Sequence, residues 1–233
     1  MLVDSVAELT MRGGKRTRAF LVWLGHETVK SDKRQETGKA LVQAMMAVEL
    51  FQSFALIHDD IIDGDATRRG GPTVHIKVGV SLAILAGDLA LVWADELMGR
   101  VSAKGGPASG WKSEDIYQAM KQEVIFGQSL DVMEEHMKIG ISKQLIDVYK
   151  TAWYSVIRPL QIGAAIVGAD EKTIASFVPY GLVVGEAYQL RDDFLDGAIS
   201  EEEFQKKAKK LVIPKPATIL FTDFARYVLT REL

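Results

Sequence analysis

Residues 40–63 read ALVQAMMAVELFQSFALIHDDIID, and between residues 40 and 57 the only charged side chain is Glu49. A helix that is apolar on all its faces lies inside a protein rather than on its surface. We therefore expect this helix at the centre of the fold, beginning near Asp32 with Gln35 three residues on, and ending at Gly64. Its last residues are acidic, so its end is expected to open into a cavity.

Apolar residues recur at intervals of three and four along most of the chain, and two-residue alternation is scarce. This pattern predicts further helices over residues 80–98, 113–138, 142–168, 170–196 and 217–229. Arg158-Pro159 is expected to break or kink the helix over 142–168. A charged run over residues 201–210 lies between the last two helices. The chain has no repeat of fixed period, so residues 1–233 are predicted to form one all-α domain.

A chain of 233 residues can bury a sizeable core without disulfides or metals. Its 28 Lys and Arg against 31 Asp and Glu give a net charge of −3, which gives no reason to expect nucleic acid as a partner. The lack of cysteine excludes disulfides and thiolate metal sites, and it allows a reducing compartment. The first residues do not resemble a secretory signal, and the longest charge-free stretch, 173–185, is too short for a bilayer. We expect a cytoplasmic protein with no integral membrane segment.

The first acidic motif is HDDIID, residues 58–63. Asp59 and Asp63 are four residues apart, so both carboxylates should lie on one helix face, with Asp60 beside them. The C-terminal end of a helix carries partial negative charge, so acids there require a compensating cation. Carboxylates with this spacing suit Mg²⁺, which prefers one or two carboxylates together with water and substrate phosphate.

The second acidic motif, QLRDDFLD at residues 189–196, repeats this spacing with Asp192 and Asp196. A single pair of acids four residues apart is common on solvated helix faces. Two copies that both end apolar helices, far apart in the sequence, are hard to explain in that way. Together they indicate two acidic walls that face each other across a cavity.

Three groups of cations accompany the acids. GGKRTR, residues 13–18, places Lys15, Arg16 and Arg18 after two glycines that let the backbone approach phosphate closely. Arg68-Arg69 follows the first acidic motif, and Lys150 lies in mid-helix. Each group alone is typical of an ordinary surface cation, but as a set they indicate a polyanionic substrate.

In this order, five motifs resemble the signature of the trans-isoprenyl diphosphate synthases, the polyprenyl synthetase family. The motifs are residues 13–18 (GGKRTR), 56–70 (LIHDDIIDGDATRRG), 127–131 (GQSLD), 150–152 (KTA) and 188–193 (YQLRDD) with Asp196. The resemblance implies the isoprenoid-synthase fold, a helical bundle with a central cavity, in a homodimer. It also implies transfer of an allylic group to isopentenyl diphosphate, which lengthens the chain by five carbons.

The same resemblance implies a role for each motif residue. Three Mg²⁺ ions per active site would be bound by acids on the two walls, namely Asp59, Asp60, Asp63, Asp131, Asp192 and Asp196, with Gln128 in support. Isopentenyl diphosphate would be held without metal by Lys15, Arg18, Gln52 and Arg69. The allylic diphosphate would be held by Arg68 and Lys150, and Thr151 and Gln189 would direct oxygen dipoles at the allylic cation.

The side chains before Asp59 are expected to limit product length. Phe54 stands five residues before Asp59, Ala55 four before it and Phe51 eight before it. In similar enzymes a bulky aromatic at the fifth position, without one at the fourth, accompanies geranylgeranyl-length products. Farnesyl diphosphate is the main alternative product. Phe51 and Phe54 could also be ordinary core residues, as aromatics at helical spacing usually are.

The chain departs from the family pattern at two places. Only eleven residues precede Arg12, and the Gly-Lys-x-Thr segment expected after the second motif does not follow Asp196. Either flexible segments of a longer protein are missing, or the chain is truncated and closes its site poorly. The competing functions are a non-catalytic regulatory subunit, which should lack one acid cluster, and a terpene cyclase, which should lack the GGKR run.

Overall fold

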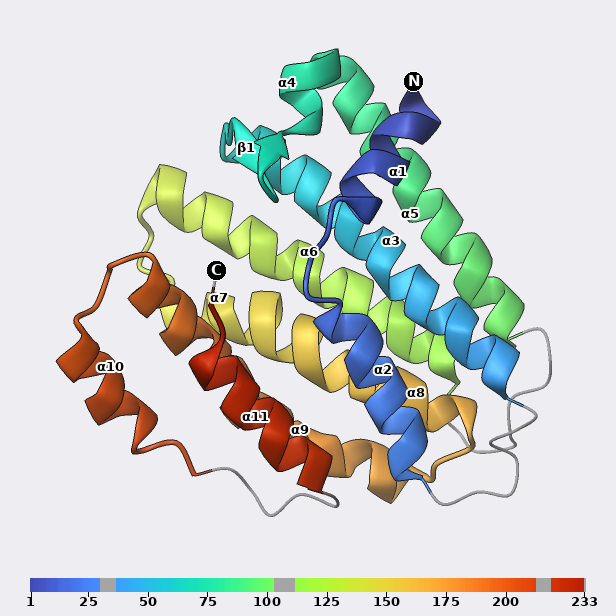
Figure 1. Ribbon diagram of the computed structural model, residues 1–233, viewed down its shortest axis with the longest axis vertical. Coiled ribbons are helices and arrows are strands. Elements are labelled where there is room, and N and C mark those ends of the chain that lie inside the picture. The colour runs from blue at the N-terminus through green and yellow to red at the C-terminus, as the bar shows by residue number, and fades with distance from the viewer. Residues whose placement is uncertain (30–36, 103–111, 213–218, 233) are drawn as a thin grey trace.

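The computed structural model describes residues 1–29, 37–102, 112–212 and 219–232, and these form the predicted all-α bundle (Figure 1). Among the described residues, strands are limited to the antiparallel pair β1 Thr67–Arg68 and β2 Gly71–Pro72. The helices are α1 Leu2–Met11, α2 Thr17–Thr28, α3 Gly38–Ile62, α4 Val74–Val78, α5 Val80–Ser102, α6 Ser113–Met137, α7 Lys143–Asp147, the π-helix η1 Val148–Ile157, α8 Arg158–Ile166, α9 Glu171–Leu195, α10 Glu201–Ala208 and α11 Ile219–Thr230.

Helix α3 lies at the centre of the bundle, as predicted, and packs against α2, α5 and α8. Its C-cap is Asp63, so the first acidic motif closes the helix as expected. The expected N-cap, Asp32, and Gln35 lie outside the described residues. The partly buried Leu50 and Phe54 each touch both clusters of buried apolar side chains, so α3 joins the two clusters. That residues 1–233 form a single domain stays a prediction.

Length and composition alone would also allow α3 to cross a membrane, because its most apolar 18 residues have a mean hydropathy of 1.6. The core helix of a globular domain meets the same criterion. Because α3 packs against α1, α2, α4, α5 and α8, its composition is weak evidence for a membrane span.

The predicted helices 113–138 and 170–196 correspond to α6 and α9 within one residue at each end. Asp170 caps α9 by accepting a hydrogen bond from the Thr173 backbone N–H at 2.8 Å. The sequence interpretation did not identify α1, α2, α4 or α10. Helix α10 falls in the charged run, where acids in the first turn and lysines in the last complement the helix dipole. Its single buried residue, Phe204, stacks on Phe194 at 4.9 Å.

The predicted helix 142–168 is a continuous series of α7, η1 and α8, and the expected break takes the form of a change from π-helix to α-helix at Arg158. Two glycines allow η1 to pack closely on its neighbours. A Cβ at Gly127 of α6 would lie 2.9 Å from the Tyr149 side chain, and one at Gly185 of α9 would lie 2.5 Å from that of Ala152. The π-helix is rare in proteins, and its short forms inside α-helices are found frequently at functional sites.

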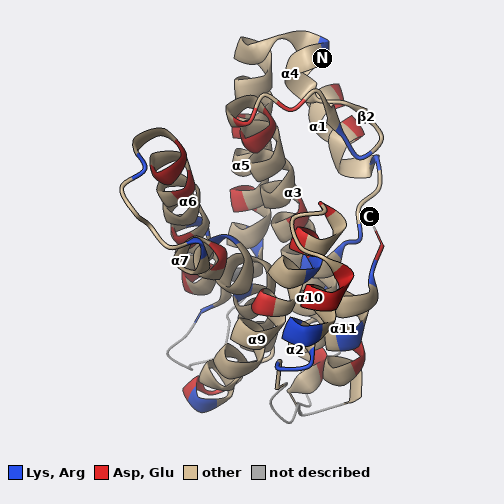
Figure 2. Ribbon diagram, turned by 90° about the vertical axis from the view of Figure 1, so that its left-hand side faces the viewer, with Lys and Arg blue, Asp and Glu red and all other residues tan. Residues whose placement is uncertain are grey.

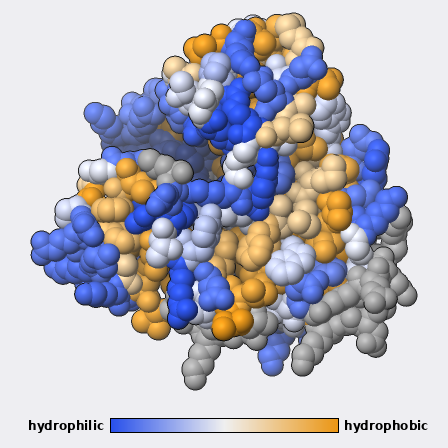
Figure 3. Space-filling view, viewed as in Figure 1, coloured by the Kyte–Doolittle hydropathy of each residue, from blue (hydrophilic) through white to orange (hydrophobic). Residues whose placement is uncertain are grey.

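An open groove of about 710 Å³ lies between α2 and α11. Apolar side chains gather on this face of the molecule (Figure 3). They include Phe20 and Trp23 of α2 and Phe224 and Tyr227 of α11, while Lys15 also lines the groove. Helix α11 is therefore packed on α9 along one side and borders a hollow on another.

Candidate active site

The end of α3 separates the three acids of the first motif. Asp60 is fully buried and accepts a hydrogen bond from Arg68 Nε at 2.6 Å, while its Oδ2 has no partner among the described residues. Asp59 is partly buried and Asp63 is more exposed, and the burial of each carboxylate raises its pKa. The charge of Lys150 opposes that rise at each of them. The structure thus brings Asp59 and Asp63 together and turns Asp60 toward Arg68.

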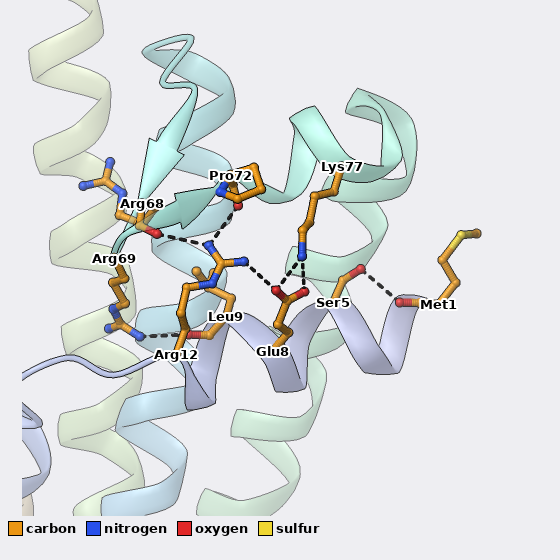
Figure 4. A network of polar contacts seen from close by, with 9 residues as sticks. All are labelled: Met1, Ser5, Glu8, Leu9, Arg12, Arg68, Arg69, Pro72 and Lys77. Carbon is orange, nitrogen blue, oxygen red and sulfur yellow. Dashed lines mark hydrogen bonds and ion pairs between the residues drawn. The ribbon is translucent and has the colours of Figure 1, made fainter.

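The β1–β2 hairpin carries Arg68 and Arg69, and α1 holds its backbone in place (Figure 4). Arg12 Nη1 donates hydrogen bonds to the carbonyl oxygens of Arg68 at 3.0 Å and Pro72 at 2.8 Å. Arg69 Nη1 donates to the carbonyl oxygen of Leu9 at 3.0 Å. Figure 4 shows the Arg68 side chain directed away from α1, so α1 fixes the hairpin without occupying this guanidinium.

The glycine-rich loop before α2 has an unusual backbone. Gly13, Gly14 and Arg16 all have positive φ, at 108°, 100° and 51°. A Cβ at Gly14 would lie 2.8 Å from a guanidinium nitrogen of Arg69, so glycine permits this close approach. The structure therefore brings Arg69 against the loop that carries Lys15. That the two residues hold one substrate stays a prediction.

Arg18 and Gln52 meet at Tyr154 of η1. The Arg18 guanidinium lies 4.3 Å from the centroid of the Tyr154 ring and donates to Ser155 Oγ at 2.7 Å. The Tyr154 hydroxyl donates to Gln52 Oε1 at 2.5 Å, and burial raises the pKa of Tyr154 to about 12. Arg18 Nε is buried with no hydrogen-bond partner among the described residues. A buried guanidinium with an unpaired N–H is a donor that an anion would satisfy.

A pocket of about 340 Å³ lies where α6, α7, η1 and α9 meet, and acidic and basic residues lie close together along the ribbon around α7 (Figure 2). It brings together four of the expected site residues. Lys150 Nζ donates to Asp131 Oδ2 at 2.5 Å, and Thr151 Oγ1 donates to Gln189 Oε1 at 3.4 Å. The complete lining is Asp131, Glu134, Ile141, Lys143, Ile146, Asp147, Lys150, Thr151 and Gln189.

Three charged residues of this pocket escaped the sequence interpretation, namely Glu134, Lys143 and Asp147. Lys143 and Asp147 precede Lys150 by seven and three residues, a spacing typical of one helical face. This spacing relative to Lys150 is the feature of the sequence that could have identified Lys143 and Asp147. Burial raises the pKa of Asp147 to about 6, and the charges of Asp193 and Asp131 add to the rise.

The second acidic motif is already paired with cations. Asp193 Oδ1 accepts from Lys143 Nζ at 2.6 Å, and Asp192 Oδ1 accepts from Arg231 Nη2. Asp196 is the exposed C-cap of α9. Arg231 follows α11 and was not among the expected site residues. It lies outside all five motifs, so the sequence gave no reason to expect it at the site.

The remaining candidates lie away from these contacts. Gln128 is partly buried on α6 and is not among the residues that line the pocket. Phe51 is fully buried between Tyr117 and Tyr154, whose ring centroids lie 6.0 and 5.7 Å from its own. Phe54 and Ala55 are partly exposed on α3. The roles of these residues stay predictions.

The acidic side chains of the site suit Mg²⁺ only when substrate phosphate and water complete its coordination shell. Within the described ranges, no three acidic or histidine side chains lie close enough to hold a metal ion by themselves. Mg²⁺ commonly takes one or two carboxylates and completes its shell with water and substrate phosphate. Asp59, Asp63 and Asp131 provide hard oxygen donors within electrostatic reach of one another, so the residues present fit such a site.

Comparison with known proteins decides the family. The model of the polyprenyl synthetase family matches residues 1–221. The chain belongs to the polyprenyl synthetase family. Two of the family members similar to it are synthases. The geranylgeranyl diphosphate synthase of Methanosarcina mazei is 35% identical over 93% of this chain, and the farnesyl diphosphate synthase of Haemophilus influenzae is 32% identical over 84% of it.

The chain spans 65% and 66% of the lengths of these two polyprenyl synthetases, slightly under two thirds of each. A solved family structure is the geranylgeranyl pyrophosphate synthase from Corynebacterium glutamicum, complexed with isoprenyl diphosphate and magnesium. It is 29% identical, and the match covers 97% of this chain and 78% of that one with a TM-score of 0.73. The resemblance inferred from the five motifs and the predicted isoprenoid-synthase bundle are both confirmed.

The pKa of Asp147 makes a testable prediction about pH. Because the folded-state pKa of about 6 exceeds the ordinary value of 3.8, the protonated carboxyl favours folding at low pH, and this stability is lost as pH rises through 6. Asp147→Asn should therefore raise the melting temperature at pH 7.5 without divalent metal, by about 2–4 °C after allowance for solvent screening. The gain should shrink toward pH 4, so an equal gain at both pH values would contradict the assignment.

Proposed function

We propose that this chain condenses isopentenyl diphosphate with an allylic diphosphate, dimethylallyl, geranyl or farnesyl, to form a longer trans-prenyl diphosphate. The observation that carries the proposal is the position of Lys150 of η1. Lys150 Nζ donates a hydrogen bond to Asp131 of α6, and its charge acts on Asp59 and Asp63 of the first acidic motif. A diphosphate bound between Lys150 and these acids would pair directly with the Lys150 ammonium. It would pair with the carboxylates only through a divalent metal ion.

In the reaction, the bond between the allylic carbon and its diphosphate oxygen breaks, and the diphosphate leaves with the electron pair. Lys150 and Arg68 would bind the diphosphate oxygens and stabilise the charge that develops on them. Bound Mg²⁺, three ions in the expected complement, would supply Lewis-acid stabilisation of the same charge. Thr151 and Gln189 are hydrogen-bonded to each other and would present oxygen dipoles to the allylic cation.

The isopentenyl alkene then forms the new carbon–carbon bond. Loss of a proton from the resulting cation restores a double bond, and the departing diphosphate is the base we expect to accept it. Lys15, Arg18, Gln52 and Arg69 would hold the isopentenyl diphosphate, with the loop before α2 and the β1–β2 hairpin setting their positions.

Metal binding is assigned to Asp59, Asp63, Asp131, Asp192 and Asp196, with Gln128 in support. For Asp60 we propose a positioning role in place of the expected direct one. Its one carboxylate oxygen holds Arg68, and the other is covered by protein. Asp60 would then act on the allylic diphosphate through Arg68.

Product length is the finer part of the proposal, and geranylgeranyl diphosphate is the product we favour, with Phe54 and Phe51 limiting the cavity. Phe54→Ala should lengthen the product, because it removes the partly buried aromatic ring nearer to the acids. Mass spectrometry of the products would measure this. Val42→Ala, at the other end of α3 and 54% exposed, should leave the distribution unchanged. An unchanged distribution in Phe54→Ala would refute this role.

A homodimer is also proposed. Val80, Ile84 and Val92 lie on one face of α5 and are 50%, 41% and 60% exposed. Phe126 and Met137 of the neighbouring α6 are 64% and 65% exposed. Large exposed apolar faces commonly mark protein interfaces. Light scattering should give about twice the 25.7 kDa mass of one chain.

A cytoplasmic location is proposed as well, and fractionation of cells would test it.

The decisive experiment is incubation with isopentenyl diphosphate and each allylic primer of five, ten or fifteen carbons, with and without Mg²⁺. A Mg²⁺-dependent twenty-carbon product would support the whole proposal. A fifteen-carbon product would retain the reaction and favour the farnesyl alternative. No product under any condition would refute the catalytic proposal and favour a regulatory subunit.

A further inference from the structure

The β1–β2 hairpin carries two adjacent arginines whose side chains lie in different places. Arg68 Nε donates to Asp60 of the first acidic motif at 2.6 Å. Arg69 instead lies against the glycine-rich loop, where a Cβ at Gly14 would be 2.8 Å from its guanidinium. The directions diverge at the turn, because Arg69 and Gly70 both have positive φ, at 51° and 74°. The position of this one hairpin therefore sets the positions of both guanidiniums.

So short a hairpin cannot hold that position by itself. Each strand has only two residues, and an isolated two-stranded hairpin is at best marginally stable in water. Arg69 adds backbone strain, because residues other than glycine rarely adopt a positive φ. After β2, the fully buried Thr73 donates through its hydroxyl to the carbonyl oxygen of Asp65 at 2.8 Å. The strands that carry the arginines need further support from outside the hairpin.

Arg12, the C-cap of α1, supplies this support (Figure 4). Its Nη1 donates to the carbonyl oxygen of Arg68 on β1 and to that of Pro72 on β2, so one guanidinium joins both strands. Gly71 permits the close approach, because a Cβ there would lie 2.9 Å from the same nitrogen. The Arg12 side chain is only 14% exposed, and Glu8 pairs with it at 2.9 Å. Arg12 is thus a largely buried crosslink between α1 and the two strands.

We propose that Arg12 is a positioning residue for both substrates, because by holding the β1–β2 hairpin it presets two diphosphate sites at once. The inference rests on the proposed function, in which Arg68 holds the allylic diphosphate and Arg69 holds isopentenyl diphosphate. Arg12 acts on both only through the hairpin backbone. Without this crosslink the hairpin is in its working position in only a fraction of the molecules. The apparent affinity for each substrate then falls by that same fraction.

The shared hairpin gives this loss a distinctive signature. Once one substrate has bound and ordered the hairpin, the other substrate meets a site that is already in place. The coupling is reciprocal, because a single conformational equilibrium produces it. A variant whose fold is merely less stable behaves differently. It lowers kcat by removing active molecules, and it leaves both KM values unchanged.

The test is Arg12→Gln, whose shorter side chain cannot join both carbonyl oxygens. At a low concentration of the other substrate, KM for isopentenyl diphosphate and KM for the allylic primer should each rise about tenfold, as for a hairpin in place in about one molecule in ten. When the other substrate is saturating, each KM should lie within about threefold of its value in the unaltered protein.

Two further measurements on Arg12→Gln need no turnover. Calorimetric titration with inorganic pyrophosphate in EDTA should show about tenfold weaker binding, because the Arg69 site is in place in fewer molecules. Hydrogen exchange followed by mass spectrometry should show faster exchange of the amides of residues 65–73, because the hairpin opens more often.

The matched control is Lys77→Gln, which removes the other partner of Glu8, in a pair whose side chains are 37% and 47% exposed. It keeps both hydrogen bonds from Arg12 to the hairpin, so it should change neither KM nor the exchange of residues 65–73. Arg12→Lys keeps the charge but lacks the planar pair of donors. It should melt like the unaltered protein and still raise both KM values.

Unchanged KM values in Arg12→Gln would overturn the inference, and so would KM values that stay raised when the other substrate is saturating. Faster exchange of the hairpin without a loss of pyrophosphate affinity would also overturn it, because Arg12 would then support the fold alone. Failure of the unaltered protein to form any prenyl product would count against the proposed function alone, since the titration and the exchange measurement are independent of turnover.

Discussion

Asp59→Asn is expected to lower kcat by about 10²–10³-fold at saturating Mg²⁺, the usual cost of removing one group that stabilises transition-state charge. The same variant should melt at an equal or higher temperature when no divalent metal is present. Burial raises the pKa of Asp59, and its carboxylate lies at the negative end of α3, so the ionised group destabilises the folded chain at neutral pH. Asparagine keeps the shape and removes the charge.

This opposite effect on activity and stability distinguishes a functional carboxylate from a structural one. The control is Asp115→Asn, an exposed acid in the first turn of α6, about 24 Å along that helix from Asp131. It should leave kcat unchanged. A joint fall of kcat and melting temperature in Asp59→Asn would show that Asp59 supports the fold and would remove it from the metal site.

Glu123→Gln should lower the free energy of unfolding by about 3 kcal/mol, the low end of the range for breaking a buried ion pair. Glu123 accepts from Arg158 Nε at 2.8 Å and from its Nη2 at 2.5 Å, and the two side chains are 19% and 10% exposed. The variant leaves the Arg158 charge without a counterion. Gln161 at 2.9 Å and the Trp153 ring at 4.6 Å still contact it, which limits the loss.

Urea denaturation would measure this effect as a fall in the midpoint at constant slope. Glu203→Gln is the matched control, because Glu203 pairs with Lys207 at 2.7 Å in solvent, with side chains 48% and 51% exposed. Exposed pairs contribute at most about 1 kcal/mol. Equal losses in the two variants would mean that the pair of Glu123 and Arg158 contributes no more than a surface contact.

The sequence was sufficient for the elements with strong periodicity. Helices α3, α6 and α9 could be predicted because their apolar faces are long and their ends carry acids or caps. Helix α1 could not, because ten residues offer few periods, and α10 could not, because it buries only Phe204. The spacing of four residues correctly placed Asp59 and Asp63 on one face. Spacing does not reveal burial, and the burial of Asp60 separates it from the other two acids.

The charged pairs were the least predictable part of the candidate site. Lys150 with Asp131 and Arg231 with Asp192 join residues 19 and 39 positions apart. Such pairs depend on how helices pack, and no local pattern encodes that packing. The motifs therefore identified Lys150, which lies inside one, and missed Arg231, which lies in none.

The π-helix η1 also makes the site sensitive to helical winding. A π-helix turns through a smaller angle per residue than an α-helix, because its hydrogen bonds join residues five apart instead of four. If the same ten residues were wound as an α-helix, Lys150 and Thr151 would rotate relative to α8. They would then turn away from Asp131 and Gln189 in a chain that still folds. The register of backbone hydrogen bonds in this segment, as well as its side chains, therefore determines which residues meet in the pocket.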